Sequence, residues 1–503
     1  MSQTAPPPRA HRTTNPDPKS AAQEGREVFF WFEGKRLKGL AGESIAKTLF
    51  RNGIRTLSHS VKYGRARGIH CGRGRCVMCH VEVDGVTGVK SCLTPLAAGM
   101  VIRRQDYRPF YGSWITGVLG RVHLPAGFYY RMFTRPRIVR RAFLDAIRRM
   151  AGVGRIDHSS NALHETPPPN PSFARLKQSY DVVVVGAGIS GLAASLGAAD
   201  AGAQVLLVDE YTVAGGHSIG RGLEPGGVAA RDNLLRRVQH AAGLDTATGT
   251  IAQGFYPPGR LLLGHARHGE SEGGLKTVAA KAFVFATGAQ DLVPLFENND
   301  LPGVFGARGL RLFLERDGLV PGHNAVVYGA TVDSGVRQTV NLLREWNIAI
   351  EAIVVADADG PGFPGPTRGA QHEDTRGDSL GNSRLYTGAK LVRAEGRGWI
   401  SRAVIETGAS TPLSVPCDLM CIAVPAQPAF ELAQQAGFRY GFSPDSALRE
   451  DLEIMTPAVD VLDDGSNPPC YLVGEASGHF EWNSKIEHAS SAGAAAVKRA
   501  VSP

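Results

Sequence analysis

The chain has 503 residues, of which 43% are hydrophobic and 20% are charged, which is typical of a globular protein of about three domains. No apolar run approaches the roughly 18 residues of a membrane span, and the polar, proline-rich N-terminus lacks the apolar core of a signal peptide. The sequence therefore predicts no membrane span, a disordered tail over residues 1–25 and a cytoplasmic protein.

The net charge of +8 is unevenly distributed along the chain. Residues 1–160 contain 28 Lys and Arg against 10 Asp and Glu, a balance of +18, which leaves −10 for the remainder. A basic segment can bind nucleic acid, but these arginines are dispersed and accompany no nucleic-acid-binding motif. We therefore expect no nucleic acid, and instead an acidic protein partner or an internal contact with the acidic part of the chain.

Four of the seven cysteines predict a 2Fe-2S cluster, because the first three follow the Cx4Cx2C spacing and a fourth follows nearby. Gly72 and Gly74 allow the tight turns between them, and Arg73 and Arg75 can offset the charge of the thiolates. The alternatives are a structural zinc site, which rarely has this first gap, and a disulfide pair, which the absence of a secretory signal disfavours. The predicted ligands are Cys71, Cys76, Cys79 and Cys92.

Residues 26–104 are expected to form a small β-rich, ferredoxin-like domain around this cluster. Alternating side chains predict a hairpin with Phe30 and Phe32 on one face, followed by a helix that ends at Gly53 and a strand that ends at Asp84. Residues 105–178 are expected to form an aromatic and helical connector, with a helix over 140–152 and a proline-rich linker.

A dinucleotide-binding fold is predicted to begin at residue 179 and to run to 320. Gly186, Gly188 and Gly191 form a GxGxxG motif between an apolar strand and an alanine-rich helix, and Asp209 and Glu210 follow about 20 residues later. The glycines would admit a pyrophosphate to the helix N-terminus, and an acid would bind the ribose hydroxyls.

Two later segments resemble motifs of two-dinucleotide-domain flavoproteins. The segment FATGAQ resembles their second nucleotide-site motif, and CYLVGEASG resembles the motif that closes the flavin site, within a closing part over 416–503. The usual Asp of the closing motif is replaced by Glu475, so FAD is predicted with NAD as a competitor for the same cleft. The further cofactor-binding candidates are Gly215, Gly216, Ala286, Thr287, Gly288, Gly474 and Glu475.

A second nucleotide-type fold is predicted over residues 321–415. Its turn keeps Gly329, but Thr331 and Ser334 replace the second and third glycines. Because a Cβ atom at the second position blocks the approach of a pyrophosphate, we expect this fold to bind NAD poorly or not at all. The glycine-rich insert over 357–378 is expected to be a mobile loop.

Other candidate residues have simpler explanations. Cys417 and Cys421 lie in an apolar strand and are expected to pack in the core rather than to form a redox pair. His217 follows two glycines near the predicted flavin, where a structural role is favoured. Tyr129 and Tyr130 could form a subunit surface or a cofactor lid. No catalytic triad or carboxylate pair is evident, so the catalytic residues are unknown.

Taken together, these segments resemble the amino-terminal half of the α subunit of heterotetrameric sarcosine oxidase and the related subunits of opine oxidase and hydrogen cyanide synthase. The resemblance includes SVKYGRARGI, LPAGFYYRMF and ATGAQDLVPLFENNDLPGVFGARGLRLFLERDGLVPG. It implies an α/β, two-dinucleotide-binding-domain flavoprotein fold preceded by the 2Fe-2S domain. It also implies a D-amino-acid-oxidase-type β subunit that oxidises an N-substituted amino acid or secondary amine, FMN at a subunit interface, and an electron acceptor protein or quinone system.

The chain departs from the sarcosine oxidase pattern in two respects. It has the four clustered cysteines that sarcosine oxidase lacks, which favours a dehydrogenase that passes electrons through the cluster. It also ends where a folate-binding half would begin, which argues against capture of a one-carbon unit. The alternatives are a self-sufficient NAD(P)H-dependent ferredoxin-type reductase and a structural subunit with an inert bound nucleotide.

Overall fold

The computed structural model describes residues 25–60, 65–105, 140, 175–211, 213–218, 227–265, 275–332, 334–356, 371–373, 383–409, 411–442, 455–463, 465, 467–478 and 482–501. Nearly all of the predicted tail and connector lie outside the described residues, as do the predicted helix over 140–152 apart from its first residue, Tyr129 and Tyr130, and most of the insert over 357–378.

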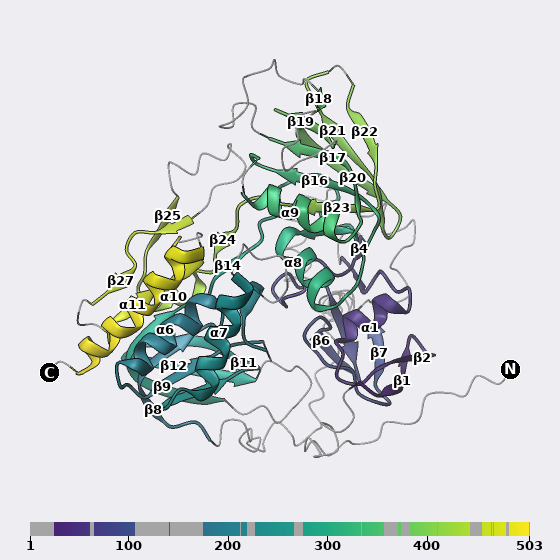
Figure 1. Ribbon diagram of the computed structural model, residues 1–503. Helices are drawn as coiled ribbons and strands as arrows, with labels where there is room; N and C mark the ends of the chain where they lie inside the picture. The colour runs from purple at the N-terminus through teal and green to yellow at the C-terminus, as the bar shows by residue number, and fades with distance from the viewer. Residues whose placement is uncertain are drawn as a thin grey trace.

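The N-terminal part is a five-stranded sheet of order β2-β1-β7-β5-β6 with one short helix beside it (Figure 1). The two-stranded ribbon β3–β4 adjoins it. The elements are β1 (Glu27–Phe32), β2 (Lys35–Leu40), α1 (Ile45–Arg51), β3 (Ser58–His59), β4 (Ala66–Arg67), β5 (His80–Val83), β6 (Val86–Lys90) and β7 (Val101–Arg104).

Local sequence explains these elements well. Strands β1 and β2 pair as the predicted antiparallel hairpin, with Phe30 and Phe32 buried on one face. Helix α1 begins after Ser44, whose side chain accepts a hydrogen bond from the backbone N–H of Lys47 at 3.2 Å. Its apolar face, including Leu49, packs into the same core. Sheet and helix together fix the position of the loop that contains Cys71, Cys76 and Cys79, called the cysteine-rich loop below.

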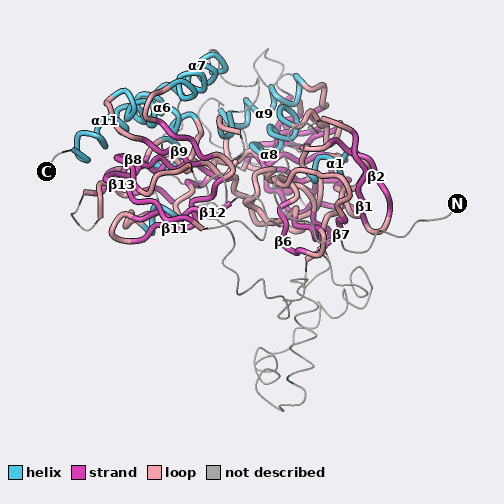
Figure 2. The backbone as a smooth tube through the Cα atoms, turned by 90° about the horizontal axis from the view of Figure 1, so that it is seen from below, coloured by secondary structure: helices cyan, strands magenta, loops and turns pink. Residues whose placement is uncertain are grey.

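The first nucleotide-type fold is an eight-stranded sheet in which β8, β9, β10, β13 and β28 run parallel. Helices α6, α7 and α11 gather over one face of β8, β9 and β13 (Figure 2). The strands are β8 (Ser179–Val185), β9 (Val205–Val208), β10 (Leu244–Ala247), β11 (Thr250–Tyr256), β12 (Arg260–His265), β13 (Lys276–Phe285), β27 (Val461–Leu462) and β28 (Cys470–Leu472). The helices are α6 (Ile189–Asp200), η3 (Gly216–Ser218), α7 (Gly227–His240), η5 (Gly474–Ser477) and α11 (Trp482–Val501).

Helices α6 and α11 approach each other unusually closely, although they are almost 300 residues apart in the chain. A Cβ atom at Gly197 would lie 2.2 Å from the carbonyl oxygen of Ser490, and one at Gly493 would lie 2.0 Å from that of Ala194. Glycine is therefore required at both positions for this contact. The close packing ties the C-terminal helix to the predicted fingerprint helix.

The second nucleotide-type fold combines a six-stranded sheet of order β15-β23-β16-β17-β19-β18 with a three-stranded sheet. Its elements are β15 (Val304–Gly306), α8 (Ala307–Arg311), the π-helix η4 (Leu312–Arg316), β16 (Asn324–Gly329), α9 (Ser334–Glu345), β17 (Ala349–Val355), β18 (Gln371–Glu373), β19 (Arg384–Thr387), β20 (Lys390–Gly396), β21 (Ile400–Glu406), β22 (Leu413–Pro416) and β23 (Leu419–Ile422). The remaining elements are β14 (Ala289–Gln290), β24 (Gln427–Pro428), α10 (Glu431–Gln435), β25 (Tyr440–Phe442) and β26 (Met455–Pro457), and α10 packs into the core of the first fold.

Strand pairing in the second fold includes residues on both sides of the predicted range 321–415. Strand β15 precedes that range and β23 follows it, yet β23 pairs in parallel with both β15 and β16. Sequence pattern identifies an apolar strand but does not show which sheet it joins, because pairing depends on distant partners. Cys417 and Cys421 are buried here, as expected.

None of the helices in the described ranges is long and apolar enough to cross a membrane.

Candidate cofactor site

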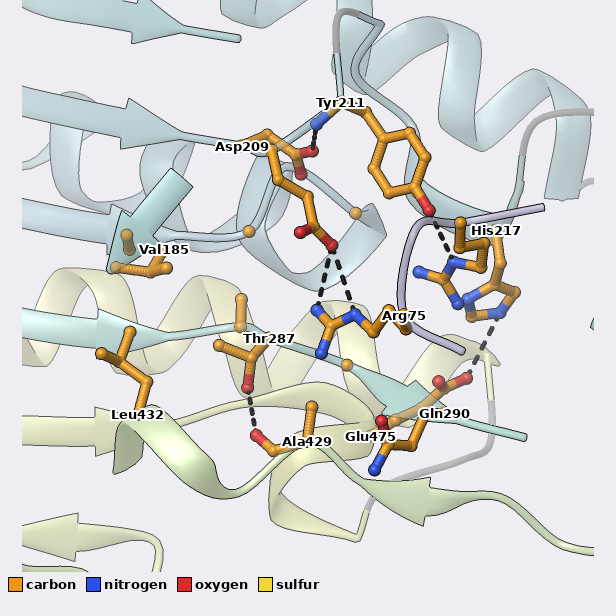
Figure 3. A pocket seen from close by; sticks show the side chains of 18 of the residues that line it. Arg75, Val185, Asp209, Tyr211, His217, Thr287, Gln290, Ala429, Leu432 and Glu475 are labelled. Atoms are coloured by element: carbon orange, nitrogen blue, oxygen red, sulfur yellow. Dashed lines mark hydrogen bonds and ion pairs between the residues drawn. The ribbon is translucent and has the colours of Figure 1, made fainter. Parts of the chain in front are cut away.

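A cavity of about 420 Å³ opens where the first nucleotide-type fold meets the cysteine-rich loop (Figure 3). The nucleotide fold contributes the fingerprint loop, the end of β9, η3 and the segment after β13. The N-terminal part contributes a second wall through Arg73, Gly74, Arg75, Val77 and Lys90.

The three fingerprint glycines have different structural roles. Gly186 has φ +104, and a Cβ atom there would lie 2.2 Å from the carbonyl oxygen of Ala286. A Cβ atom at Gly191 would lie 1.6 Å from the carbonyl oxygen of Gly186. At Gly188, the N-cap of α6, the nearest atom to such a Cβ would be 4.0 Å away and the residue faces the cavity. Thus Gly186 and Gly191 make the turn, and Gly188 leaves room for a ligand.

A second glycine turn faces the fingerprint loop. Gly215 has φ +123 and donates its backbone N–H to the carbonyl oxygen of Ala187 at 2.8 Å. Gly216 has φ +59 and lines the cavity beside Gly188. These two predicted residues therefore contact the fingerprint loop, although they follow Gly191 by 24 and 25 residues in the chain.

The two acids after β9 differ in their environment. One carboxylate oxygen of Asp209 accepts from the N–H of Ala187 at 2.5 Å and the other accepts from Tyr211 at 2.7 Å, while burial raises the pKa of Asp209. Glu210 instead forms an ion pair with Arg75 at 3.2 Å. Asp209 therefore holds the fingerprint loop to the end of β9, and Glu210 faces the cysteine-rich loop; both line the cavity.

The segment after β13 closes another side of the cavity. Thr287 donates its hydroxyl to the carbonyl oxygen of Ala429 at 2.7 Å, and Gly288, with φ +72, accepts from the N–H of Ala429 at 2.9 Å. Ala286 is buried beside the fingerprint loop. All three predicted residues line the same cavity.

Glu475 lies at the centre of a buried charged group in this cavity. It follows Gly474, which has φ +69, and its carboxylate oxygens lie 3.3 Å from His217 Nε2, 3.2 Å from Arg308 Nη1 and 3.5 Å from Lys485 Nζ. Burial raises the pKa of Glu475, but Arg308, His217 and Lys485 outweigh it and bring the pKa to about 2. The carboxylate is therefore ionised at neutral pH.

The four predicted cluster ligands are free thiols arranged as two pairs. A hydrogen bond with Cys76 is the main cause that lowers the pKa of Cys71, and one with Cys92 likewise lowers the pKa of Cys79. In the described part of the chain, no group of three or more His, Cys, Asp or Glu side chains is arranged to hold a single metal ion. A 2Fe-2S cluster binds two thiolates at each of its two irons, so four thiols are the number that it needs.

Contacts with the second nucleotide-type fold fix the cysteine-rich loop. His70 Nδ1 lies 2.9 Å from the carbonyl oxygen of Val304, and Arg316 donates to the carbonyl oxygen of Gly72 at 3.2 Å. A Cβ atom at Gly309 would lie 2.3 Å from the carbonyl oxygen of His70, so the loop packs directly against α8. The loop is therefore held between two folds.

Sequence reasoning missed several residues of the cavity. Arg308, Lys485 and Tyr211 are not among the predicted site residues. Tyr211 and Lys485 line the cavity, and Arg308 contacts Glu475 there, because α8, α11 and the end of β9 pack together. Sequence spacing assigns the cysteine-rich loop to the cluster alone. It places the arginines of that loop near the thiolates and not at the nucleotide cavity.

Comparison with known protein families agrees with this architecture. Residues 25–107 match the family of 2Fe-2S iron-sulfur cluster binding domains, and residues 180–449 match the pyridine nucleotide-disulphide oxidoreductase family. Because the second match covers more than half of the chain, the protein belongs to the pyridine nucleotide-disulphide oxidoreductase family. The predicted fold, a two-domain flavoprotein preceded by a 2Fe-2S domain, is confirmed.

Among proteins of known activity, the chain is 28% identical over 438 residues to the alpha subunit of sarcosine oxidase from Rhizobium meliloti (strain 1021), which covers 83% of this chain and 42% of that protein. It is 32% identical over 161 residues to an opine oxidase subunit of the same organism, covering 30% of this chain and 33% of that one. The predicted resemblance is confirmed, and the chain spans less than half the length of these relatives.

Among solved structures, L-proline dehydrogenase from P. horikoshii aligns with a TM-score of 0.62 and 21% identity, covering 94% of this chain and 74% of that chain. This similarity shows a shared fold.

The residues present fit both cofactors that these families imply. The paired thiols suit a 2Fe-2S cluster, and the open space at Gly188 beside the N-terminus of α6 suits a pyrophosphate. The family matches support a 2Fe-2S cluster and FAD. They give no support to NAD as a competitor for the cavity or to FMN at an interface.

Proposed function

We propose that this chain is the electron-transfer and cofactor-binding subunit of a heteromeric oxidoreductase that oxidises N-substituted amino acids or secondary amines. The oxidation itself would take place on a D-amino-acid-oxidase-type flavoprotein partner, and an acceptor protein or quinone system would receive the electrons. Cys71, Cys76, Cys79 and Cys92 would hold the cluster, which supplies one-electron transfer. The dinucleotide would occupy the cavity at Gly188.

The contact between the cysteine-rich loop and the nucleotide cavity carries this proposal. The backbone N–H of Arg73 donates to Cys71 Sγ at 3.3 Å, and its side chain donates to the hydroxyl of Tyr211 at 3.3 Å in the cavity wall. Two adjacent redox sites suit an electron-transfer protein. The similarity to sarcosine oxidase and opine oxidase subunits supports an amine or amino acid as the source of electrons.

The second nucleotide-type fold weighs against a self-sufficient NAD(P)H-dependent reductase, which would need a second nucleotide site for hydride delivery. Thr331 has a Cβ atom where a pyrophosphate-binding turn has its second glycine. A Cβ atom at Gly329 would lie 2.4 Å from Val336 Cγ2, so the side chains of α9 already pack against this turn.

The test compares the isolated chain with its complex. The purified, cofactor-loaded chain is mixed anaerobically with sarcosine, an opine or proline and an artificial electron-accepting dye. We expect no substrate-dependent dye reduction by the chain alone. When the chain is co-expressed with a D-amino-acid-oxidase-type partner, substrate should produce the EPR signal of a reduced 2Fe-2S cluster.

A matched control is the same complex with Cys76→Ser, in which substrate should still reduce the partner flavin but the cluster signal should be lost or altered. Substrate-dependent dye reduction by the isolated chain, with its purity confirmed, would contradict the proposal. Reduction by NADH or NADPH alone would instead support the self-sufficient reductase.

A further inference from the structure

We propose that the cluster-binding loop is part of the nucleotide site, so that cluster loading and nucleotide binding strengthen each other. Arg73 and Arg75 would bind the nucleotide directly from the loop that also carries Cys71 and Cys76. This inference rests on the proposed function, since it takes the cavity to be a nucleotide site and the four thiols to hold a cluster.

Arg73 contacts the cluster loop through its backbone and the nucleotide cavity through its side chain. Its backbone N–H donates to Cys71 Sγ at 3.3 Å, so the position of its Cα depends on the cluster loop. Its guanidinium donates to the Tyr211 hydroxyl at 3.3 Å and to the carbonyl oxygen of Ala289 at 3.4 Å. Both acceptors belong to the first nucleotide-type fold, so the side chain spans the boundary between the cluster loop and that fold.

Arg75 makes the second contact and is the loop residue that Figure 3 places within the cavity. Its guanidinium lies 3.2 Å from the carboxylate of Glu210, next to Asp209 at the end of β9. An arginine side chain has five N–H donors, so Arg75 can bind a phosphate and keep this ion pair.

The charges of the N-terminal wall of the cavity suit an anionic ligand. The N-terminal part contributes three charged residues to the cavity, and all three, Arg73, Arg75 and Lys90, are cationic. A dinucleotide has two phosphate groups, and cations that face a partly enclosed cavity attract such an anion strongly. The nucleotide fold provides the glycine turn, and the cluster loop provides the positive charge.

The loop can act in this way only if its conformation is fixed. Gly72 and Gly74 have φ +59 and +71, which are left-handed conformations that glycine adopts without strain. Binding of four thiolates to one cluster would hold the loop in these conformations. When the cysteines are not ligated, the loop keeps its contacts with Val304 and Arg316, but we expect the arginines to be held less firmly. Coupling between two binding sites is reciprocal, so a bound nucleotide must stabilise the cluster to the same extent.

The experiment measures both directions on the full chain, purified anaerobically and depleted of nucleotide. FAD is titrated into cluster-loaded and chelator-stripped protein, and quenching of flavin fluorescence gives the dissociation constant. We expect the constant to be about tenfold larger without the cluster, comparable to the loss of one charge-assisted hydrogen bond. In the reverse direction, bleaching of the cluster absorbance by an iron chelator should slow when FAD is bound.

Removal of the cluster could weaken FAD binding simply by unfolding the N-terminal part. Substitutions in cluster-loaded protein avoid this second effect. Arg75→Gln and Arg73→Gln are compared with Arg103→Gln, which removes the same charge from an exposed residue on β7 that pairs with Glu82 at 3.8 Å. EPR confirms that each variant carries its cluster. The two loop variants should bind FAD about tenfold more weakly, and Arg103→Gln should match the wild type.

The outcomes distinguish this inference from the proposed function. FAD binding that is tight but equal in the loaded, stripped and loop-variant proteins would overturn the coupling and leave the FAD assignment in place. Failure of the cluster-loaded wild-type protein to bind FAD at all would overturn the FAD assignment and this inference with it. Weaker binding by the loop variants together with slower bleaching in FAD supports the coupling.

Discussion

Gly188 and Gly216 lie side by side in the wall of the nucleotide cavity. A Cβ atom at Gly216 would lie 2.9 Å from the Cα of Gly188, whereas one at Gly188 would remain 4.0 Å from the Cα of Gly216. The two positions therefore respond differently to substitution. Gly188 can accept a methyl group without disturbing the protein, but Gly216, with φ +59, cannot.

The first prediction is that Gly188→Ala folds normally and loses nucleotide, and that Gly188→Val abolishes nucleotide retention. The added side chain takes the space that a pyrophosphate needs, while the nearest heavy atom of the described residues lies 4.0 Å from the added Cβ. Thermal unfolding and extraction of bound nucleotide check the two parts separately. An unchanged content of nucleotide in Gly188→Val would contradict the assignment of this cavity.

Gly191→Ala is the matched control within the same motif. Its Cβ atom would lie 1.6 Å from the carbonyl oxygen of Gly186, so the contact between α6 and the fingerprint turn must open. This variant should lose stability as well as nucleotide, by a few kcal/mol, as is usual for overpacking in a core. If Gly188→Ala destabilises the protein as much as Gly191→Ala does, the loss of nucleotide cannot be attributed to the cavity.

The second prediction concerns the metal content. The anaerobically purified protein should contain about two irons and two acid-labile sulfides per chain, as a four-cysteine 2Fe-2S site requires. Cys76→Ser should remove or shift the EPR signal of the reduced cluster, because Cys76 is one of the paired thiols. Cys417→Ser, at a buried thiol distant in sequence, is the control and should retain iron. Stoichiometric zinc without iron would refute the cluster assignment.

The third prediction is a pH dependence of stability that arises from His217. The charge of Glu475 raises the pKa of His217, but burial and the nearby Arg308, Arg73 and Lys485 outweigh it and bring the pKa to about 3. An unfolded histidine has a pKa of about 6.5, so the unfolded state binds a proton that the folded state excludes. The stability is therefore present above pH ~6.5 and declines as the pH falls toward 3, by at most about 1.4 kcal/mol per pH unit.

The unfolding temperature of His217→Gln, measured between pH 7.5 and 5, should therefore change less with pH than that of the wild type. His240→Gln, at an exposed residue at the end of α7, provides the comparison because it removes a histidine that contacts only the backbone of Arg236 among the bonds described for it. Parallel profiles for the wild type and His217→Gln would show that His217 is not held neutral by its surroundings.

The fourth prediction concerns association with the partner protein. The balance of +18 over residues 1–160 should steer an acidic partner or electron acceptor toward the chain. The association rate, measured by stopped-flow or surface binding, should fall as salt is raised, while the dissociation rate changes less. An association rate that is insensitive to salt would argue against electrostatic steering.

Local sequence was sufficient for the elements whose structure depends on neighbouring residues. The hairpin with Phe30 and Phe32, the helix that ends before Gly53 and the glycine turn at Gly186 follow from side-chain alternation and from the turn conformations that glycine permits, and the structure has all three. The Cx4Cx2C spacing gives a ligand set because a short loop limits which thiols can meet, and this set stays a prediction.

Only the tertiary structure determined which distant segments share the site. The sequence separates Arg75 from Glu210 by 135 residues and Lys485 from Glu475 by 10, and no motif includes either contact. The assignment of β23 to the second sheet, and of the cluster loop to the wall of the nucleotide cavity, also depends on how whole folds pack together. The pattern of side chains along the sequence predicts the local structure of each segment. Contacts between domains form between surfaces that exist only in the folded chain, so the pattern does not predict them.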